Sequence, residues 1–383
     1  MSANPIAVIG GGPVGLTLAL LLARRHVPTA VVDARNIDDA KRDRRLLALS
    51  RGTLDTLGAL VDLPAGSLAP LRSVVVSSRG EFGRAVLGEQ DNGGQALGAT
   101  VRYGDLLAVL DAACVAQPLV RLRRPCAVNS MRQTASGVEV RLPDAETLMA
   151  PIAVSAEGTG GPGAPQAARQ TALTGDVEVD GPAAGAAFER FTRDGPLALL
   201  PLPGPASGAT RTMSLVWCMP SASADRREQL ADRELLAELQ AEFGERNGRL
   251  RAIRARGRYP LVEHARAEVR EHRVIHVGNA AQTLHPVAGQ GLNLGVRDCV
   301  ALADVIASAV ADGQDPITGL PDYERRRRAD RLAIRTLTRT VPGFFATGFA
   351  PIAAARSLGL TMLSIFPDLR AEFARFLMFG VRS

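Results

Sequence analysis

Short apolar segments alternate with longer helical patterns over the first third of the chain. Residues 6–9 and 29–32 are continuous apolar runs of strand length, and residues 14–25 between them have the length and apolar content of a helix. Further helices are expected over residues 51–60 and 105–116. Alternation of this kind predicts parallel strands that are joined by helices.

The middle of the chain follows a different pattern. Residues 171–262 contain short stretches rich in β-forming residues, broken by Pro and Gly, and one helical pattern around residues 227–243. Short strands with frequent turns are typical of an antiparallel sheet. Apolar strands expected at residues 152–156 and 273–277 flank this region and resemble a return to the first pattern.

A glycine-rich turn follows the first apolar run. Gly10, Gly12 and Gly15 form the pattern Gly-x-Gly-x-x-Gly between the strand and the helix. Such a turn directs backbone N–H groups and a helix N-terminus at a diphosphate, and Asp33 ends the second strand where a carboxylate accepts ribose hydroxyls. The contacts predicted here for a dinucleotide are Gly10, Gly12, Pro13, Val14, Gly15 and Asp33.

A second glycine-bearing segment covers residues 277–295. It contains Gly278-Asn279 and then Pro286-Val287-Ala288-Gly289-Gln290-Gly291, which precede another apolar helix. A nicotinamide enzyme needs one such cradle, whereas FAD needs one at its diphosphate and another at its ring end. Two cradles therefore favour bound FAD.

The second segment has features that suit the ring end of a flavin. Asn279 follows a strand and can bond a ribityl hydroxyl, and the small residues 286–289 let a flavin ring and an oxygen adduct approach the backbone. A helix that starts at Leu292 and Asn293 favours negative charge on the reduced ring. A glycine-rich loop that begins a core helix would give the same pattern. The predicted cofactor contacts are Gly278, Asn279, Gly289, Gly291, Leu292 and Asn293.

Together these patterns predict an α/β protein with a discontinuous Rossmann-like FAD-binding domain, an inserted, mostly antiparallel β-sheet substrate domain and a helical C-terminus. We expect the FAD-binding domain at residues 1–72, 98–170 and 263–340, the substrate domain at 73–97 and 171–262, and the C-terminal helical region at 341–383.

Composition excludes several classes of protein. The net charge of +6 comes almost wholly from arginine, since Lys41 is the only lysine, and no basic cluster is interleaved with aromatic residues. We expect no nucleic-acid binding, and a basic surface that suits anionic lipid. The four cysteines lack metal-ligand spacing, and no apolar run reaches the roughly 20 residues of a membrane span. A cytoplasmic protein without a metal site, in peripheral contact with the inner membrane face, is expected.

Four segments carry a resemblance to a known family. They are the N-terminal glycine motif, residues 43–50, residues 187–202 and, above all, residues 278–298. The chain resembles the aromatic-ring flavoprotein monooxygenases of ubiquinone biosynthesis, and is most similar to their polyprenyl-methoxyphenol hydroxylase branch. Asn279, where most of the wider superfamily has Asp, is typical of this branch. The resemblance covers nearly the whole chain.

The resemblance implies roles for two arginines. Arg45 occupies the position at which the family contacts the cofactor and handles the nicotinamide donor, although a solvated run with Arg42 and Arg44 fits the same residues. Arg102 is expected at the cofactor diphosphate or ribose.

The expected catalytic residues gather at the ring end. His285 is either a histidine held by the backbone beside the flavin loop or a proton-transfer group. The predicted catalytic set is Arg45, His285, Pro286 and Gly289.

One motif departs from the superfamily pattern. Its Asp-Gly after an apolar strand is Glu157-Gly158 here, and its downstream Ser and Arg are replaced by residues 159–163. Glu157 keeps the charge, but its side chain is one methylene longer. We retain Glu157 as a cofactor contact and expect the departure to affect binding of the nicotinamide donor.

The resemblance implies a reaction. NAD(P)H would reduce FAD, O₂ would add to form a C4a-hydroperoxyflavin, and a lipophilic polyprenylated phenol would take the distal oxygen, in contact with other proteins of ubiquinone biosynthesis. The sequence does not identify the residue that activates the phenol. One alternative is another flavoenzyme, either a soluble aromatic-acid hydroxylase or a prenyl reductase. The other is a catalytically weakened flavoprotein scaffold of a quinone-biosynthesis complex, which the Glu157 departure would tolerate.

The C-terminal region carries an apolar stripe at helical spacing. Its members are Phe366, Leu369, Phe373, Phe376 and Leu377. Such a stripe serves either as core packing or a partner helix, or as a membrane-facing or complex-facing surface that admits a polyprenyl tail. Residues 325–328 and Arg331 would support the second interpretation through their positive charge.

Overall fold

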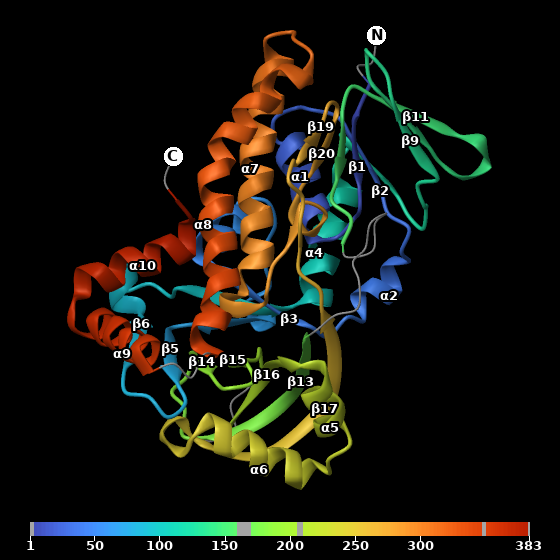
Figure 1. Ribbon diagram of the computed structural model, residues 1–383. Coiled ribbons are helices and arrows are strands. Elements are labelled where there is room, and N and C mark those ends of the chain that lie inside the picture. The colour runs from blue at the N-terminus through green and yellow to red at the C-terminus, as the bar shows by residue number, and fades with distance from the viewer. Residues whose placement is uncertain (1–3, 159–169, 205–209, 347–349, 382–383) are drawn as a thin grey trace.

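A computed structural model describes residues 4–158, 170–204, 210–346 and 350–381 (Figure 1). Residues 159–163, which replace the superfamily's usual Ser and Arg, lie outside the described residues. Two sheets dominate the structure, one with the strand order β19-β20-β12-β1-β2-β8 and one with the order β17-β13-β16-β15-β14-β5-β6. The second sheet lies below the first in Figure 1, with its own helices beneath it. The α/β class and the mostly antiparallel inserted sheet are confirmed; the domain limits stay a prediction.

The six-stranded sheet is built on buried apolar strands. Its members are β1 (Ile6–Ile9), β2 (Thr29–Val32), β8 (Val120–Arg123), β12 (Ala153–Ser155), β19 (Arg270–Glu271) and β20 (Val274–His276). All pairs are parallel except β19 with β20. Every residue of β1 and β2 is buried, because both faces of this sheet are covered.

Helices cover one face of this sheet, and a small sheet covers the other. α1 (Pro13–Ala23) contacts α4 (Tyr103–Ala116) and α7 (Gln290–Ala311), and α8 (Leu320–Ala346) packs on α7. α1 is buried almost all round, which explains why it is apolar on all sides. On the opposite face, β9 (Ser130–Gln133), β10 (Val138–Arg141) and β11 (Thr147–Ala150) form an antiparallel sheet, and Val138 and Val140 join the core under β1. The sequence patterns did not reveal this small sheet.

The seven-stranded sheet contains longer strands than expected. Its members are β5 (Ser73–Ser78), β6 (Arg84–Gly88), β13 (Gln170–Asp180), β14 (Ala186–Phe191), β15 (Pro196–Pro201), β16 (Thr210–Pro220) and β17 (Arg249–Leu261). Only β5 and β14 pair in parallel. Gly175 does not end β13, because it lies at a shift in register between Thr174 and Asp176. Pro260 is tolerated because β17 is an edge strand.

Two helices, where one was expected, cover the outer face of the seven-stranded sheet. α5 (Ser221–Glu228) and α6 (Asp232–Phe243) are separated by a short break, and the Glu234 carboxylate accepts a hydrogen bond from the Ala231 backbone N–H at the start of α6. Phe243 of α6 meets Phe188 of β14 edge to face, with ring centroids 5.4 Å apart. This contact fixes which face of β14 points toward the helices.

A third sheet joins the two large ones. β3 (Leu46–Ser50) and β4 (Leu68–Leu71) pair antiparallel with β7 (Gly98–Arg102). The Thr100 hydroxyl donates to the Pro201 carbonyl of the seven-stranded sheet at 2.5 Å. The remaining elements near this region are α2 (Ile37–Lys41), α3 (Arg51–Gly58), β18 (His264–Ala265) and β21 (Gln282–Thr283).

The C-terminal region is helical, as expected. α9 (Ala350–Ile365) and α10 (Pro367–Phe379) pack beside β6 (Figure 1). The buried face of α10 is formed by Ala374 and Met378, which contact the core near Leu87, whereas Phe366 and Leu369 are about half exposed. Of the predicted stripe, Phe373 also packs against this core, so the stripe is partly buried and partly exposed. Among the described residues, no helix combines the length and the apolar content that crossing a bilayer requires.

Candidate functional site

The two glycine segments, far apart in sequence, lie side by side. Val14 at the start of α1 is the common contact: a Cβ added at Gly278 would lie 3.1 Å from its side chain, and one added at Gly295 only 2.9 Å from it. The Cys299 thiol donates to the Val14 carbonyl at 3.4 Å. Glycine at these two positions lets α7 approach α1 closely. The structure thus brings together the two segments that the sequence identified.

The first turn has the geometry of a phosphate cradle. Gly10 has φ +107°, and a Cβ there would lie 2.7 Å from the Ala156 carbonyl carbon; a Cβ on Gly15 would lie 1.9 Å from the Gly10 oxygen. A Cβ on Gly12 would meet only Tyr103 Oη at 3.5 Å and Arg35 Nη2 at 3.6 Å. Gly10 and Gly15 are therefore required by the fold. Gly12 leaves room in front of the first turn of α1, whose N–H groups lack a side-chain cap.

Asp33 is fixed at the end of β2. Its buried carboxylate accepts hydrogen bonds from the Gly11 N–H at 2.5 Å and from the Arg35 N–H at 2.7 Å. The Arg35 guanidinium lies 3.3 Å from the same carboxylate and donates to the Tyr103 hydroxyl. Arg124 donates to the Gly11 carbonyl at 3.0 Å. The sequence patterns did not predict that Arg35 and Arg124 contact this turn. The position of Arg35, two residues after Asp33, could have indicated its contact, but no sequence signal indicated that of Arg124.

Glu157 lies at the nucleotide end of this arrangement. A Cβ on Gly10 would lie 2.8 Å from the Glu157 backbone nitrogen. Burial and the nearby Asp33 charge raise the pKa of the Glu157 carboxyl. The backbone of Glu157 therefore lies against the first turn, and its carboxyl is close enough to Asp33 for the two charges to interact. The role of Glu157 as a cofactor contact stays a prediction.

The second segment forms two tight turns. Gly278 and Gly289 have φ +58° and +59°, and a Cβ on Gly289 would lie 2.9 Å from the Ala48 Cβ. α7 begins at Gln290, earlier than the predicted start at Leu292, because Gly289 adopts the left-handed conformation that precedes it. Among the described residues, no atom outside the adjoining chain and helix backbone lies within 4 Å of a Cβ on Gly291. The start of α7 therefore borders open space, as a cradle for a ligand requires.

Asn279 and Asn293 differ in what their side chains can do. Asn279 is exposed, and its amide has no hydrogen-bond partner among the described residues. The Asn293 amide donates to the carbonyls of Ala48 at 3.0 Å and Gly289 at 2.8 Å, and accepts from the Ser50 N–H at 2.9 Å. Asn279 is thus able to bond a ligand hydroxyl, whereas the Asn293 side chain holds the turn against β3. Whether Asn293 and its half-buried neighbour Leu292 contact the cofactor stays a prediction.

Arg45 is held in place despite its exposure. Its side chain is 48% exposed and makes an ion pair with Asp43 at 2.6 Å. Its guanidinium lies 5.0 Å from the ring centre of Tyr103 and 5.9 Å from that of Tyr259. Burial lowers the pKa of Arg45, but Asp43 outweighs it, and the net pKa is raised. Arg45 therefore has defined contacts with Asp43 and two aromatic rings, which could not be found from sequence spacing, and its roles with the cofactor and the nicotinamide donor stay predictions.

Arg102 bridges two sheets. Its guanidinium donates to the Arg44 carbonyl at 2.7 Å and pairs with Asp176 of β13 at 3.1 Å. Its predicted contact with the diphosphate or ribose is untested and stays a prediction.

His285 is buried and has neighbours at both ring nitrogens. The Val287 N–H donates to Nδ1 at 3.4 Å, which places the ring proton on Nε2, and Nε2 lies 3.1 Å from Gln170 Oε1. Burial lowers the pKa of His285 to about 4. These contacts suit a histidine that positions the turn after the half-buried Pro286. Catalytic roles for His285, Pro286 and Gly289 stay predictions.

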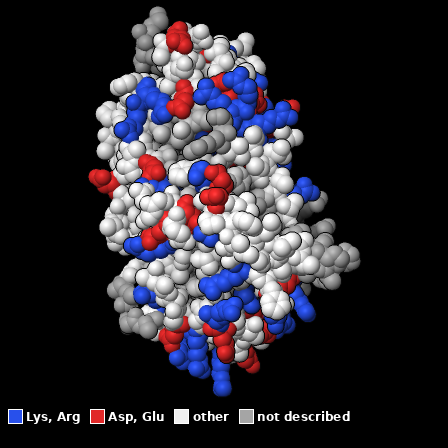
Figure 2. Space-filling model, turned by 90° about the vertical axis from the view of Figure 1, so that its left-hand side faces the viewer, with Lys and Arg blue, Asp and Glu red and all other residues white. Residues whose placement is uncertain are grey.

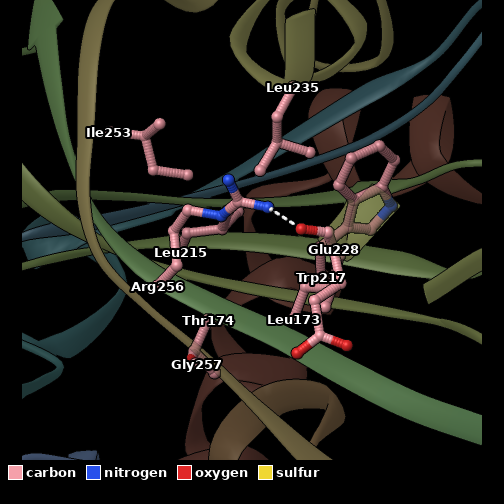
Figure 3. A pocket seen from close by; sticks show the side chains of 9 residues that line it. All are labelled: Leu173, Thr174, Leu215, Trp217, Glu228, Leu235, Ile253, Arg256 and Gly257. Atoms are coloured by element: carbon pink, nitrogen blue, oxygen red, sulfur yellow. Dashed lines mark hydrogen bonds between the residues drawn. The ribbon is translucent and has the colours of Figure 1, made fainter. Parts of the chain in front are cut away.

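A separate cavity of about 90 Å³ lies beneath the outer face of the seven-stranded sheet (Figure 3). Leu173, Leu215, Trp217, Leu235 and Ile253 line it, and Arg256 donates to the Glu228 carbonyl at its edge at 2.7 Å. The Arg227 guanidinium lies 4.2 Å from the Trp217 ring centre. Because α5 and α6 cover this face, the cavity is on the opposite side of the sheet from the glycine segments, and belongs to the packing of the helices.

The fold and the paired glycine turns define a flavoprotein with the architecture of FAD-dependent monooxygenases. Residues 3–336 match the model of the FAD binding domain family, and the chain belongs to this family. The predicted cofactor, FAD, is thereby confirmed.

Known proteins resemble the chain along almost its whole length. It is 32% identical to ubiquinone hydroxylase UbiL of Rhodospirillum rubrum, over 97% of this chain and 89% of the relative. It is 29% identical to 3-demethoxyubiquinol 3-hydroxylase of Escherichia coli, over 93% of each chain. The crystal structure of p-nitrophenol 4-monooxygenase PnpA from Pseudomonas putida has the same fold, with a TM-score of 0.76 and 19% identity over 100% of this chain and 99% of the other. The predicted resemblance to hydroxylases of ubiquinone biosynthesis is confirmed.

Proposed function

We propose that this protein is an FAD-dependent monooxygenase that hydroxylates a polyprenylated phenol in ubiquinone biosynthesis, with NAD(P)H as reductant and O₂ as co-substrate. The observation that carries the proposal is full-length similarity to two quinone hydroxylases in a chain whose two glycine segments converge on one site. Bound FAD supplies the transfer of electrons to oxygen and the activation of oxygen.

The residues of the chain divide the binding of this cofactor between them. The turn from Gly10 to Gly15, with the first N–H groups of α1, would hold the diphosphate, and Asp33 would accept the ribose hydroxyls. Asn279 would bond the ribityl chain, and the start of α7 at Gln290 would face the ring. The closely packed turn around Gly289 would exclude water from the ring.

The decisive experiment follows electrons and oxygen together. Purified holoenzyme is mixed with NADH or NADPH, ¹⁸O₂ and ortho-prenylphenol. We expect oxidation of the nicotinamide to be stimulated by the phenol and ¹⁸O to appear in the product. Oxidation without incorporation of oxygen would indicate a reductase. Full FAD content with no response to any phenol would indicate a scaffold.

The lipid tail of such a substrate calls for access from a membrane. Five residues of α9, α10 and the junction between them form an exposed apolar patch: Leu358, Met362, Ile365, Phe366 and Leu369, which are 43–63% exposed. Arg356 and Arg370 on the same helices turn inward, to Glu81 and Asp91. At the level of these helices, Figure 2 shows an uncharged area between arginine-rich areas above and below it. We infer that this apolar patch lies against the inner membrane face, where the substrate is dissolved.

The arginines at the start of α8 contribute less to such a surface than their number indicates. Arg325 and Arg326 are paired with Asp322, and Arg327 is buried, where it contacts Asp298 and Asp330. Arg327 faces α7 because the helical period turns it inward.

Vesicle binding tests the apolar patch. The full chain is expected to float with vesicles that contain phosphatidylglycerol, and the double variant Ile365→Glu, Leu369→Glu to lose this binding. Val115→Glu is the matched control, because Val115 on α4 is 70% exposed and outside the patch. Equal binding by all three proteins would remove the membrane proposal and leave the hydroxylase proposal intact.

A further inference from the structure

Glu189 lies on β14, an inner strand of the seven-stranded sheet. Its neighbour Phe188 points toward α6, where it contacts Phe243. Since successive side chains of a strand point to opposite faces, Glu189 points to the other face, toward the part of the molecule that carries the glycine segments (Figure 1).

The surroundings of Glu189 are apolar. Val76 of β5 and Ala198 of β15 lie directly beside it in the sheet. The side chain is half-buried, and no described residue makes a hydrogen bond or an ion pair with its carboxylate. By contrast, Glu178 of β13 is paired with Arg254, and Glu242 of α6 with Arg79. A carboxylate that has no partner among the described residues is costly in such surroundings, and the packing of those residues does not explain it.

Few groups of the described part of the chain could influence its charge. Among the described titratable groups, the Cys218 thiol of β16 interacts with the charge of Glu189. Burial and this carboxylate both raise the pKa of Cys218. Arg190, next in the strand, donates to the Glu242 carbonyl on the other face. Arg335 and Arg339 of α8 make no ion pair with Glu189. Burial raises the pKa of the Glu189 carboxyl to about 7.

The fold relates this face of β14 to the ring end of the cofactor site. α8 contacts both β14 and the turn Val287–Gly289, and its C-terminal end reaches the seven-stranded sheet in Figure 1. α8 therefore links the strand that carries Glu189 to the turn that would face the flavin ring.

We propose that Glu189 is the catalytic residue that accepts the proton of the substrate's phenolic hydroxyl. This inference rests on the proposed function and supplies the phenol-activating group that the sequence did not identify. The phenol O–H bond breaks, its electron pair stays on the phenol oxygen and increases electron density at the ring carbons, and a new O–H bond forms on the Glu189 carboxylate. The proton later passes to water, and no electrons are exchanged in this step.

The acid–base properties of the two groups agree with this role. A carboxylate with a pKa near 7 is a stronger base than an ordinary Glu, yet weaker than a phenolate, whose conjugate acid has a pKa of about 10. The proton therefore moves as the ring carbon reacts, and not before. Above neutral pH the carboxylate is ionised and ready to accept it.

Binding without turnover gives the first test. Oxidised holoenzyme, without NAD(P)H, is titrated with ortho-prenylphenol and with its methyl ether, and the flavin absorbance is followed. The wild type is expected to prefer the phenol, and Glu189→Gln to lose about tenfold or more of that preference, because the ether cannot donate a hydrogen bond to the carboxylate. Glu178→Gln is the matched control, and should keep the wild-type preference.

The pH profile of hydroxylation gives the second test. In the wild type and Glu178→Gln, kcat/KM should rise with pH through about 7; in Glu189→Gln it should be lower and flat over that range. Glu189→Asp keeps a carboxylate and should keep the rise, and it provides the measurement if Glu189→Gln fails to retain FAD. A Glu189→Gln enzyme that hydroxylates with the wild-type pH profile and the wild-type preference for phenol overturns the inference alone. A wild type that neither binds nor hydroxylates the phenol overturns the proposed function with it.

Discussion

Gly15 and Gly12 of the first turn should respond differently to substitution by alanine: the change at Gly15 should mainly lower folding stability, and the change at Gly12 should mainly lower affinity for FAD. Gly15→Ala places a Cβ 1.9 Å from the Gly10 carbonyl oxygen, so α1 must move away from β1. Overpacking of this kind costs about 1–3 kcal/mol of folding stability. In Gly12→Ala the new Cβ lies no closer than 3.5 Å to another group, and the backbone φ of −79° suits alanine. The stability of apo Gly12→Ala should stay within about 0.5 kcal/mol of wild type.

For FAD affinity, Gly12→Ala should be the more damaging of the two substitutions. The space in front of Gly12 is where the diphosphate would approach the backbone, so a methyl group there should weaken FAD binding by about 10- to 100-fold, or about 1.4–2.8 kcal/mol. Urea denaturation of the apoproteins measures folding stability, and quenching of FAD fluorescence measures affinity. Wild-type affinity in Gly12→Ala would refute the position of the diphosphate, and wild-type stability in Gly15→Ala would refute the packing argument.

Three further predictions concern stability. Burial lowers the pKa of His285 from 6.5 to about 4, so the unfolded chain binds a proton at this side chain first as pH falls. Folding stability should therefore drop between these two pH values by up to about 3 kcal/mol. In His285→Gln, urea denaturation should show a flatter dependence of stability on pH over this range. Leu235→Ala enlarges the 90 Å³ cavity under α6 and should cost about 2–5 kcal/mol in urea, whereas Leu332→Ala, at a 62% exposed position, should cost less than about 0.5 kcal/mol. Asp330→Ala removes the acceptor of the Val381 N–H and the carboxylate that pairs with Arg297 and the buried Arg327. The substitution should cost about 3–5 kcal/mol of folding stability and raise the rate of hydrogen exchange at the Val381 amide. Unchanged exchange there would contradict the anchoring of the C-terminal residues by Asp330.

The sequence was most informative where burial is complete. β1 and β2 follow the predicted limits, because strands covered on both faces are continuous apolar runs. It was less informative in the inserted sheet, where Pro and Gly were expected to break the strands, yet Gly175 and Pro260 lie within β13 and β17. Their tolerance depends on a register shift and on an edge position, and both are properties of the assembled sheet.

The candidate site shows the same division. The glycines could be predicted because their spacing follows from the geometry of the turn itself. The roles of Arg35, Tyr103 and Tyr259 could not, since tertiary contacts bring them together from separate elements. The hydrogen bond from the Asn293 amide to the Ala48 carbonyl of β3 could not be predicted for the same reason.

The position of β1 within its sheet has a consequence for synthesis. The strand is made first, yet it lies beside β12, which pairs in turn with β20, so Ala7 meets Ala153, and Ala153 meets Val274. The seven-stranded sheet is complete at Leu261, before β20 exists. On the ribosome, therefore, the inserted sheet can close while the nucleotide sheet still awaits its last parallel strand, and the predicted flavin site can be complete only after β20 and α7 have been made.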